Sequence, residues 1–291
     1  MRLTLRQLTI FVAVADTGST SAAGEQIALS QSATSGALKE LETVLGAQLF
    51  DRIGKRLLLN DSGRAVLARA RALLGAAQEL ENTFGGAETA STRLRVAAST
   101  TIGNYLLPAL VASYQRNSPS TAIEVDIGNT RDVAASVARL EVDLGLIEGP
   151  CHEPDLRVMP WRDDELVIVC AATHPLRTGG RVPLTALRTA RWLQREPGSG
   201  TREAVEHALL PHFHHLEGSL QLGSTEAIKQ AAAEGMGLAC LSACAVQDLV
   251  TLGRLVVLQT TLPRLSRRFY LVHHRQKHFS SELKKFAEHI A

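Results

Sequence analysis

The 291-residue sequence has little excess charge of either sign, with 31 Lys and Arg against 29 Asp and Glu. Gross charge therefore indicates no polyanionic partner, and any nucleic-acid binding would depend on local placement of basic residues. No stretch approaches the roughly 18 consecutive apolar residues of a membrane span. The N-terminal segment MRLTLRQLTIFVAVA has apolar residues at helical spacing with polar interruptions, unlike a signal peptide. These absences predict a soluble, cytoplasmic protein.

Cysteine is also scarce. Cys151, Cys170, Cys240 and Cys244 follow no zinc-binding or thioredoxin-like spacing. The runs LVIVCAA and GLACLSAC place cysteines in apolar surroundings, which favours buried, reduced thiols, although redox sensing through Cys240 and Cys244 stays open. A chain of this length can bury a hydrophobic core that is stable without a disulfide bond or a bound metal. The length also predicts two or three packed units.

Signatures of catalysis are missing as well. Asp163, Asp164 and Glu165 are adjacent, and neighbouring side chains on a strand alternate in direction, so they cannot converge as a catalytic pair. The histidine groups HFHH and VHHRQKH come with no cysteine or carboxylate at a recognised metal-binding spacing. The G-x-S-x-G nucleophile elbow does not occur. We therefore expect no catalytic residue, no metal and no cofactor.

What the sequence does contain begins with short helices separated by capping residues. A helix over about residues 4–16 ends at Gly18, and Ser19 or Thr20 can cap the next, over about residues 21–28. Ser30 can cap a longer helix whose apolar positions recur at helical spacing and which ends at Gly46. Two short helices joined by a tight turn, the second longer and better capped, are typical of a helix-turn-helix.

The segment AQLFDRIGKRLLLND, residues 47–61, predicts a two-stranded hairpin with a basic tip. Its cationic residues lie near a glycine-bearing turn, which suits a wing over a neighbouring groove of DNA. From residue 61 to residue 84, apolar residues alternate at spacings of four and three, which predicts a coiled-coil seam about three heptads long and hence a dimer. The seam residues are Val66, Ala70, Leu73, Ala77, Leu80 and Phe84.

Three motifs carry a family resemblance: the LSQSA-S turn into the third helix, LE--LG--LF-R after it, and L--N--G before the linker helix. With them, about the first seventy residues closely resemble the N-terminal part of LysR-type transcriptional regulators. The resemblance implies a chain of α+β and α/β class with a winged helix-turn-helix at 1–60 and a linker (dimerisation) helix at 61–86. A hinge at 87–93 and a two-lobed α/β, periplasmic-binding-protein-like effector domain at 94–291 would follow.

The third helix carries hydroxyl and amide groups near its N-terminus, which suit phosphate oxygens, and Gln31 can reach a base edge. By themselves these groups are equally typical of a solvated helix face. Gly36 stands where members of the family often have a larger or charged residue, which predicts an altered or relaxed site preference. The DNA contacts implied by the resemblance are Ser30, Gln31, Ser32, Thr34, Ser35 and Lys39, with Arg52, Lys55 and Arg56 in the wing.

Beyond residue 93 strands alternate with helices, as in LRVAAS, TIGNYLLPALVASYQRN, AIEVDIG, TRDVAASVARLE and VDLGLIE. This βαβαβ order predicts a parallel sheet covered on both faces. A second set of strands and helices follows, so we expect lobe I at about 94–160 and 265–291 and lobe II at about 161–264. Open parallel sheets bind ligands at the carboxyl ends of their strands, which would here face each other across a cleft.

Three strand-to-helix turns, STTIGN, GNTRD and GSTEA, combine hydroxyls with the free amides of a helix start, which suits a carboxylate, sulfate or phosphate group. Helix capping alone explains each one, and it is their recurrence that favours a ligand. The richest turn is REPGSGTR, residues 195–202, whose glycines permit close backbone approach and which is not a Walker A loop. The effector contacts implied by the resemblance are Ser99, Thr100, Thr101, Asn129, Ser199, Gly200, Thr201 and Thr225.

Together these features predict a sequence-specific DNA-binding regulator, and the resemblance makes activation more usual than repression. Its DNA binding or promoter bending would respond to a small anionic or polar metabolite in the interlobe cleft. The expected partners are double-stranded promoter DNA, this effector, RNA polymerase and further copies of the chain, as a dimer and, by resemblance, a tetramer, but no membrane. Two alternatives stay open: a solute-binding module with an oligomerising N-terminal helical region, and a thiol redox sensor.

Overall fold

The computed structural model describes residues 3–54, 56–84, 93–177, 179–213, 216 and 220–291. The chain divides into two compact units, residues 1–90 with the short segment 276–280, and residues 91–275 with 281–291. Among the described residues, no helix has the length and apolar character that spanning a membrane requires.

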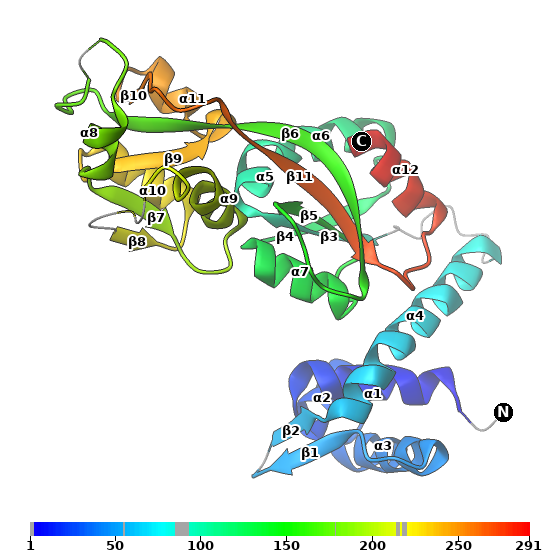
Figure 1. Ribbon diagram of the computed structural model, residues 1–291. Coiled ribbons are helices and arrows are strands. Elements are labelled where there is room, and N and C mark those ends of the chain that lie inside the picture. Colours follow the sequence, from blue (N-terminus) through cyan, green and yellow to red (C-terminus); the bar gives the residue numbers. More distant parts are fainter. Residues whose placement is uncertain (1–2, 55, 85–92, 178, 214–215, 217–219) are drawn as a thin grey trace. The chain divides into compact units, whose positions relative to one another are not determined.

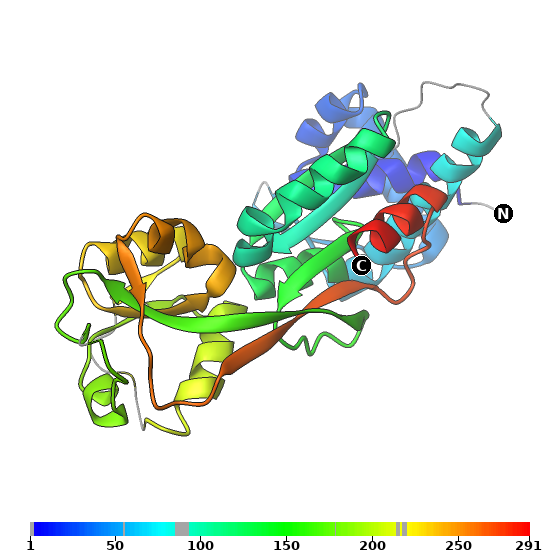
Figure 2. The same ribbon diagram turned by 90° about the horizontal axis from the view of Figure 1, so that it is seen from above.

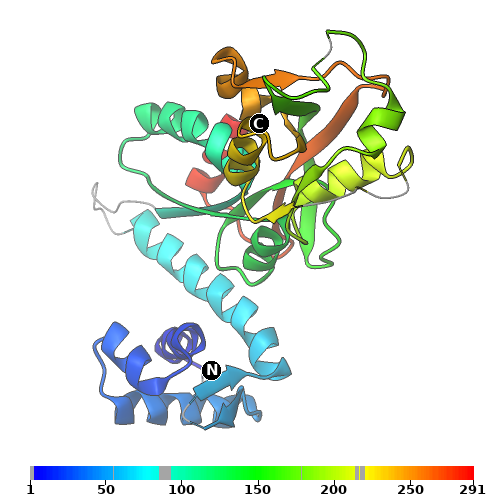
Figure 3. The same ribbon diagram turned by 90° about the vertical axis from the view of Figure 1, so that its left-hand side faces the viewer.

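The first unit is a winged helix-turn-helix followed by a long helix, as the sequence predicts. Its elements are α1 (Leu5–Thr17), α2 (Thr20–Gln26), α3 (Gln31–Leu45), β1 (Phe50–Ile53), β2 (Arg56–Leu59) and α4 (Asp61–Phe84). Figure 3 shows α1 to α3 and the β1–β2 hairpin gathered at one end of α4. Strands β1 and β2 pair antiparallel, with Ile53 opposite Arg56, and Gly54 follows with a φ of +61°.

Capping residues set the helix boundaries in this unit. Thr4 forms a capping box with Gln7 at the start of α1, and Gly18 ends that helix with a φ of +67°. The hydroxyls of Ser19 and Ser30 accept hydrogen bonds from the first turns of α2 and α3. Because Ser19 is the cap, α2 begins at residue 20. It ends at residue 26, so both ends lie slightly earlier than the sequence pattern predicts.

The core of the first unit joins the start of α4 to the other helices and the hairpin. The rings of Phe11 and Phe50 meet edge to face with centroids 5.5 Å apart. Gly63 lets α4 approach β1 closely, since a Cβ at this position would lie 2.1 Å from the carbonyl oxygen of Leu49. Ala70, further along α4, is buried in the same core. The first half of α4 therefore belongs to the packing of this unit.

The second unit is built on a single mixed sheet. Within the described residues the strand order is β4-β3-β5-β11-β6-β9-β7-β8, with β10 paired to β6. Its strands are β3 (Arg93–Ser99), β4 (Ala122–Gly128), β5 (Leu144–Glu148), β6 (Leu156–Ala171), β7 (Trp192–Arg195), β8 (Leu220–Leu222), β9 (Leu238–Ser242), β10 (Leu255–Val257) and β11 (Leu265–His274). Its helices are α5 (Thr100–Tyr105), α6 (Leu107–Asn117), α7 (Thr130–Ala138), α8 (Leu184–Arg188), α9 (Gly200–Leu209), α10 (Thr225–Ala233), α11 (Ala243–Thr251) and α12 (Ser281–Ile290).

Two α/β lobes share this sheet. Lobe I contains β3, β4 and β5 in parallel, and lobe II contains β7, β8 and β9 in parallel. The long antiparallel strands β6 and β11 run through both lobes, as Figures 1 and 2 show. The register of β11 against β6 shifts between Arg268 and Tyr270, between the segments that face the two lobes. The two lobes are therefore joined by continuous strands.

The long strand β6 differs from the sequence expectation, which recognised only its second half from residue 163. Its first half, residues 156–162, is mostly half-buried or exposed and lacks a continuous apolar run, so it gives little strand signal. The adjacent acids Asp163 and Asp164 pair with Arg268 and Arg267 on β11, and Glu165 pairs with Arg264. They point to different partners, as the alternation of strand side chains requires.

Candidate DNA and effector sites

The start of α3 presents hydroxyl and amide groups to solvent. Gln31, Ser32 and Lys39 are exposed and Ser35 is half-buried. The hydroxyls of Ser30 and Ser32 lie 3.1 Å apart, and Ser30 also accepts a hydrogen bond from a backbone amide of the first turn. Ser30, Gln31, Ser32 and Ser35 therefore lie together at the N-terminal end of α3, and Lys39 lies further along the same helix.

Thr34 differs from the rest of that set. Its side chain is fully buried, and its hydroxyl donates to the carbonyl oxygen of Ser30 at 3.0 Å. A Cβ on Gly24 of α2 would come within 3.0 Å of the Thr34 hydroxyl oxygen. The structure thus places Thr34 in the packing of α3 against α2, where its side chain does not face solvent.

The wing carries exposed basic residues on both strands, Arg52 on β1 and Arg56 on β2. Lys55, also predicted to contact DNA, lies outside the described residues. A groove of about 750 Å³ separates α3 from the wing, with Ser35 and Lys39 from the helix and Arg52 from the wing among its lining residues. Lys39 and Arg52 thus border the groove from the two elements, together with the acidic Glu42 and Asp51.

The predicted coiled-coil seam on α4 divides into two parts. Val66 and Ala70 pack into the core of their own unit. Leu73 and Leu80 are 51 % and 61 % exposed, which is high for leucine, and Ala77 between them is half-buried. The side chain of Phe84 lies outside the described residues. An apolar face is therefore left open on the second half of α4.

In the second unit, two of the predicted effector residues meet at a carboxylate of the chain itself. Glu148 ends β5 and is 1 % exposed. Its Oε1 accepts a hydrogen bond from the amide of Thr101 at 2.7 Å, and its Oε2 accepts one from the hydroxyl of Thr201 at 2.5 Å. Arg267 Nη1 donates to the same Oε2 at 2.8 Å. Glu148 of lobe I is therefore bound by a hydroxyl from lobe II.

The ion pair extends from Arg267 to a second buried carboxylate. Arg267 Nε donates to Asp164 Oδ2 at 2.7 Å, and Ser242 donates its hydroxyl proton to Asp164 Oδ1 at 2.6 Å. Burial opposes ionisation of Glu148, but Arg267 and the hydrogen bonds from Thr201 and Thr101 hold its pKa below the usual 4.5. Glu148 therefore stays ionised at neutral pH, and Arg267 lies between the carboxylates of Glu148 and Asp164.

A second cluster forms around Arg195, the last residue of β7, which is 2 % exposed. Its Nη1 donates to the hydroxyls of Thr100 at 2.7 Å and Thr225 at 2.6 Å, and these two hydroxyl oxygens lie 3.2 Å apart. Its Nε and Nη2 donate to the two carboxylate oxygens of Glu196 at 2.7 and 2.8 Å. We call these four residues the Arg195 cluster. It brings together predicted effector residues from α5 of lobe I and α10 of lobe II.

Other predicted effector residues serve as helix caps or lie buried. Asn129 accepts a hydrogen bond from the amide of Asp132 at the start of α7, and Ser199 accepts one at the start of α9. The Ser99 hydroxyl is buried and has no hydrogen-bond partner among the described residues. Burial opposes ionisation of Glu196, yet Arg195 and the Asn129 side chain hold its pKa below the usual value.

The glycines of REPGSGTR are explained by backbone contact between the lobes. A Cβ on Gly200 would lie 1.5 Å from the carbonyl oxygen of Glu148 and 2.6 Å from the hydroxyl oxygen of Thr130. Gly198 has a φ of +93°, and its carbonyl accepts a hydrogen bond from the amide of Arg131 at 3.1 Å. Only glycine allows the start of α9 to lie this close to β5 and α7.

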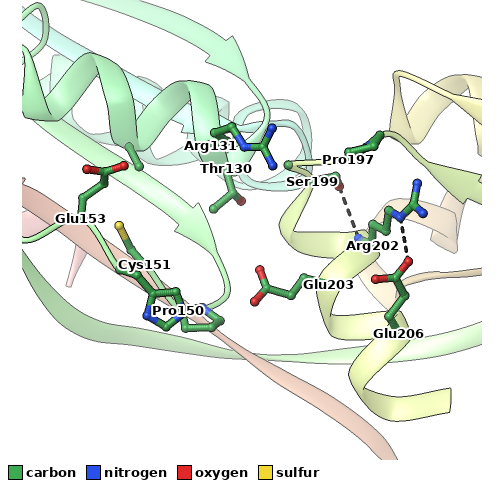
Figure 4. Close-up of a pocket in the computed structure, with 13 residues that line it drawn as sticks. Thr130, Arg131, Pro150, Cys151, Glu153, Pro197, Ser199, Arg202, Glu203 and Glu206 are labelled. Atoms are coloured by element: carbon green, nitrogen blue, oxygen red, sulfur yellow. Dashed lines mark hydrogen bonds and ion pairs between the residues drawn. The ribbon is translucent and has the colours of Figure 1, made fainter. Parts of the chain in front are cut away.

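A pocket of about 490 Å³ opens beside this contact, between α7, the segment after β5, and α9 (Figure 4). Arg131 borders it from α7, and Glu203 from α9. Arg202 on its rim is tied to Glu206 by an ion pair of 2.8 Å. Among the predicted effector residues, Ser199 lines this pocket. The pocket therefore combines charges of both signs from both lobes.

The sequence reasoning did not single out the charged residues at the centre of these clusters, Glu148, Arg267 and Glu196. Glu148 directly follows the buried run LGLI, and a carboxylate at the end of an apolar strand was an available signal. Arg267 gave none, because the next residue of the same strand, Arg268, is also an arginine and is exposed. Arg195 entered the sequence prediction only as the first residue of the turn REPGSGTR.

The fold and these sites define a DNA-binding regulatory protein whose second unit has the two-lobed form of a ligand-binding domain. Residues 5–64 match the family model for the bacterial regulatory helix-turn-helix protein of the lysR family, and residues 87–291 match that for the LysR substrate binding domain. The chain belongs to the LysR family of bacterial transcriptional regulators. The family and the fold class inferred from the sequence are thereby confirmed.

Several known proteins resemble this chain over most of its length. The HTH-type transcriptional regulator YeiE of Escherichia coli strain K12 is 47 % identical over 289 residues, which are 99 % of this chain and 97 % of YeiE. A full-length variant of OxyR from Pseudomonas aeruginosa has the same fold, with a TM-score of 0.80 at 24 % identity, covering 100 % of this chain and 94 % of OxyR. The CcmR regulatory domain of Synechocystis PCC6803, solved in complex with 2-PG, is 32 % identical with a TM-score of 0.62, covering 69 % and 96 % of the two chains.

Proposed function

We propose that this regulator binds a partly palindromic promoter site as a dimer, with the start of α3 in the major groove and the wing on adjacent phosphates or the minor groove. The groove between α3 and the wing carries this proposal, because Lys39 borders it from the helix and Arg52 from the wing, and both can contact DNA phosphates. Gln31 and Ser32 lie at the N-terminal end of α3, which is the part of a recognition helix that contacts base edges.

A salt titration of DNA binding tests this placement. The double variant Arg52→Ala with Arg56→Ala should bind promoter DNA more weakly and should lower the slope of log affinity against log salt by about 0.9 for each phosphate that is no longer neutralised. Arg116→Ala, which removes an exposed basic residue from α6, is the matched control and should leave affinity and slope as they are. Unchanged affinity and slope in the wing variant would favour the alternative, a solute-binding module with an oligomerising N-terminus.

We infer that the effector is a small anion held at the Arg195 cluster. The observation behind this is the buried guanidinium of Arg195, on which the hydroxyls of Thr100 and Thr225 from the two lobes meet. The solved complex of the CcmR regulatory domain with 2-PG supports a small-molecule effector in this domain. A ligand held by both lobes can favour one arrangement of the lobes over another only if it binds the two arrangements with different affinity.

A thermal-shift screen with sulfate, phosphate and small carboxylates tests the effector class. A ligand of the native state stabilises it by about RT ln(1 + [L]/Kd), so a true effector raises the melting temperature, and a tighter one raises it more. Thr225→Val keeps the shape of the side chain and removes one hydroxyl of the cluster, so it should weaken that shift. A shift of the same size in Thr225→Val would place the binding elsewhere.

We further propose that two chains associate through α4, that dimers pair into a tetramer able to bend promoter DNA, and that RNA polymerase is recruited, with activation the usual outcome. The exposed Leu73 and Leu80 support the first of these steps. Redox sensing is not favoured: burial raises the pKa of Cys240 to about 12 and also raises that of Cys244, so the reactive thiolate is scarce at neutral pH.

A further inference from the structure

The Arg195 cluster already contains an anion, the carboxylate of Glu196. Arg195 Nε and Nη2 donate to the two oxygens of this carboxylate at 2.7 and 2.8 Å, the paired geometry by which arginine binds free carboxylates and phosphates. Its Nη1 is taken by Thr100 and Thr225. Hence Glu196 occupies the face of Arg195 through which an anionic ligand would be bound.

Glu196 is placed so that it can leave this position. It follows the last residue of β7, lies outside any helix or strand, and its side chain is 20 % exposed. Glu148, the other carboxylate at the lobe boundary, lies in a strand, is buried and is bound by three donors, so it is fixed.

We propose that Glu196 is a tethered competitor of the effector, which binds by taking the Nε and Nη2 face of Arg195 while the Glu196 carboxylate turns to solvent. This inference rests on the proposed anionic effector and deepens it, because it names the group the effector must present: a carboxylate, phosphate or sulfate with two oxygens available to one guanidinium. The buried arginine keeps one anionic partner before and after the exchange, so no unpaired charge is left inside.

The exchange also connects binding to the contact between the lobes. Glu196 belongs to lobe II, and the arginine that it pairs with also donates to Thr100 of lobe I. Release of Glu196 exchanges the anion on this arginine, and the effector then makes its own contacts to Arg195 and the threonines. Because the competitor is part of the chain, the effector can bind only the fraction of protein in which Glu196 has left Arg195. The apparent affinity is the intrinsic affinity multiplied by this fraction.

Anion titration of full-length Glu196→Gln tests the competition. The variant keeps the shape of the side chain and removes its charge, so sulfate, phosphate or acetate should bind at least about tenfold more tightly than to the wild type by calorimetry, which is about 1.4 kcal/mol. Its melting temperature should fall in the absence of these anions and be restored by them. Glu234→Gln makes the same charge change at an exposed, arginine-paired glutamate of lobe II outside the cluster, and it should behave as the wild type does.

The outcomes separate this inference from the proposed function. If the wild type binds a probe anion and Glu196→Gln binds it equally or less tightly, the competition is refuted and the anionic effector stands. An equal gain in Glu234→Gln would reduce the effect to overall charge and also refute it. If none of the probe anions binds any of these proteins, the anionic effector fails as well. Should Glu196→Gln not fold, Glu196→Asp, with its shorter reach, must still bind the probe anion more tightly than the wild type.

Discussion

The backbones of Gly200 and Glu148 are in direct contact where the start of α9 in lobe II meets the end of β5 in lobe I. A Cβ on Gly200 would lie 1.5 Å from the carbonyl oxygen of Glu148, far inside any tolerated distance. Thr201, the next residue, donates its hydroxyl proton to the Glu148 carboxylate at 2.5 Å. The position of α9 against lobe I thus depends on one glycine and one threonine.

Gly200→Ala should therefore destabilise the second unit. Backbone atoms oppose the added methyl group, and the lobes would have to shift, so we expect a loss of about 3 kcal/mol, at the upper end of overpacking effects. Thermal unfolding of the full chain measures it. Gly223→Ala is the matched control in the same unit, since a Cβ there meets nothing within 4 Å, and its change should stay within about 0.5 kcal/mol. Equal melting temperatures for the two variants would contradict the contact.

The turn REPGSGTR shows which features of the site can be predicted from the sequence and which cannot. Its glycines and hydroxyls correctly indicated close backbone approach at a helix start, because these properties are local. The atom approached by Gly200 belongs to Glu148, more than fifty residues away, and no local signal specifies it. A turn that cradles a ligand and a turn that cradles a carboxylate of its own chain have the same composition, so the sequence could not distinguish them.

The helices and hairpin of the first unit could be predicted because contacts between residues close in sequence determine them. The effector clusters depend on contacts between residues far apart in sequence, so they could not be predicted. Thr4, Ser19, Ser30 and the glycines at 18 and 46 act within four residues of their own position. The meeting of Thr100 and Thr225 on Arg195 depends instead on how strands from two lobes are ordered in one sheet. Periodicity reports which face of an element is buried, but it does not report its partner.

The buried Glu148 carboxylate predicts a pH-dependent stability. Its pKa in the folded protein lies below the usual 4.5, so its contribution is complete above that pH and is lost as pH falls through the folded value. Glu148→Gln should remove this acid-side dependence. It should also cost about 2–3 kcal/mol at neutral pH, because Arg267 loses one of its two buried carboxylate partners while Asp164 remains.

Urea unfolding at a series of pH values checks this expectation. Glu165→Gln is the control, since Glu165 pairs with Arg264 at the surface and such pairs contribute about 0–1 kcal/mol. If Glu148→Gln and the wild type lose stability with the same slope below pH 4.5, the buried carboxylate is not the group responsible.

The exposed leucines of α4 predict that a charge placed among them weakens the association of two chains. Leu80→Glu keeps a good helix former but places a charge on the open apolar face, so it should shift the protein toward monomer in sedimentation velocity. Gln78→Glu puts the same charge on an exposed position of the same helix that lies off the apolar seam, and it should leave association as it is. A dimer of unchanged affinity in Leu80→Glu would show that chains meet through another surface.

Gly36 predicts how the DNA preference of α3 can be changed. It is exposed, a Cβ there would meet nothing within 4 Å, and its spacing of four from Ser32 and three from Lys39 places it on their helix face. Gly36→Arg should bind DNA more tightly and change the preferred base at one position, since a bidentate arginine–guanine contact discriminates by about 1–3 kcal/mol. Binding to the promoter site and its single-base variants at fixed salt measures this.

Gly36→Ala separates that effect from helix stability. Both substitutions remove the cost of glycine inside a helix, about 1 kcal/mol, so both should raise the melting temperature of the first unit. Only arginine is long enough to reach a base edge or a phosphate, so only Gly36→Arg should alter the sequence preference. If both variants keep the wild-type preference, the face defined by Ser32 and Lys39 does not enter the groove, and the docking of α3 proposed above is wrong.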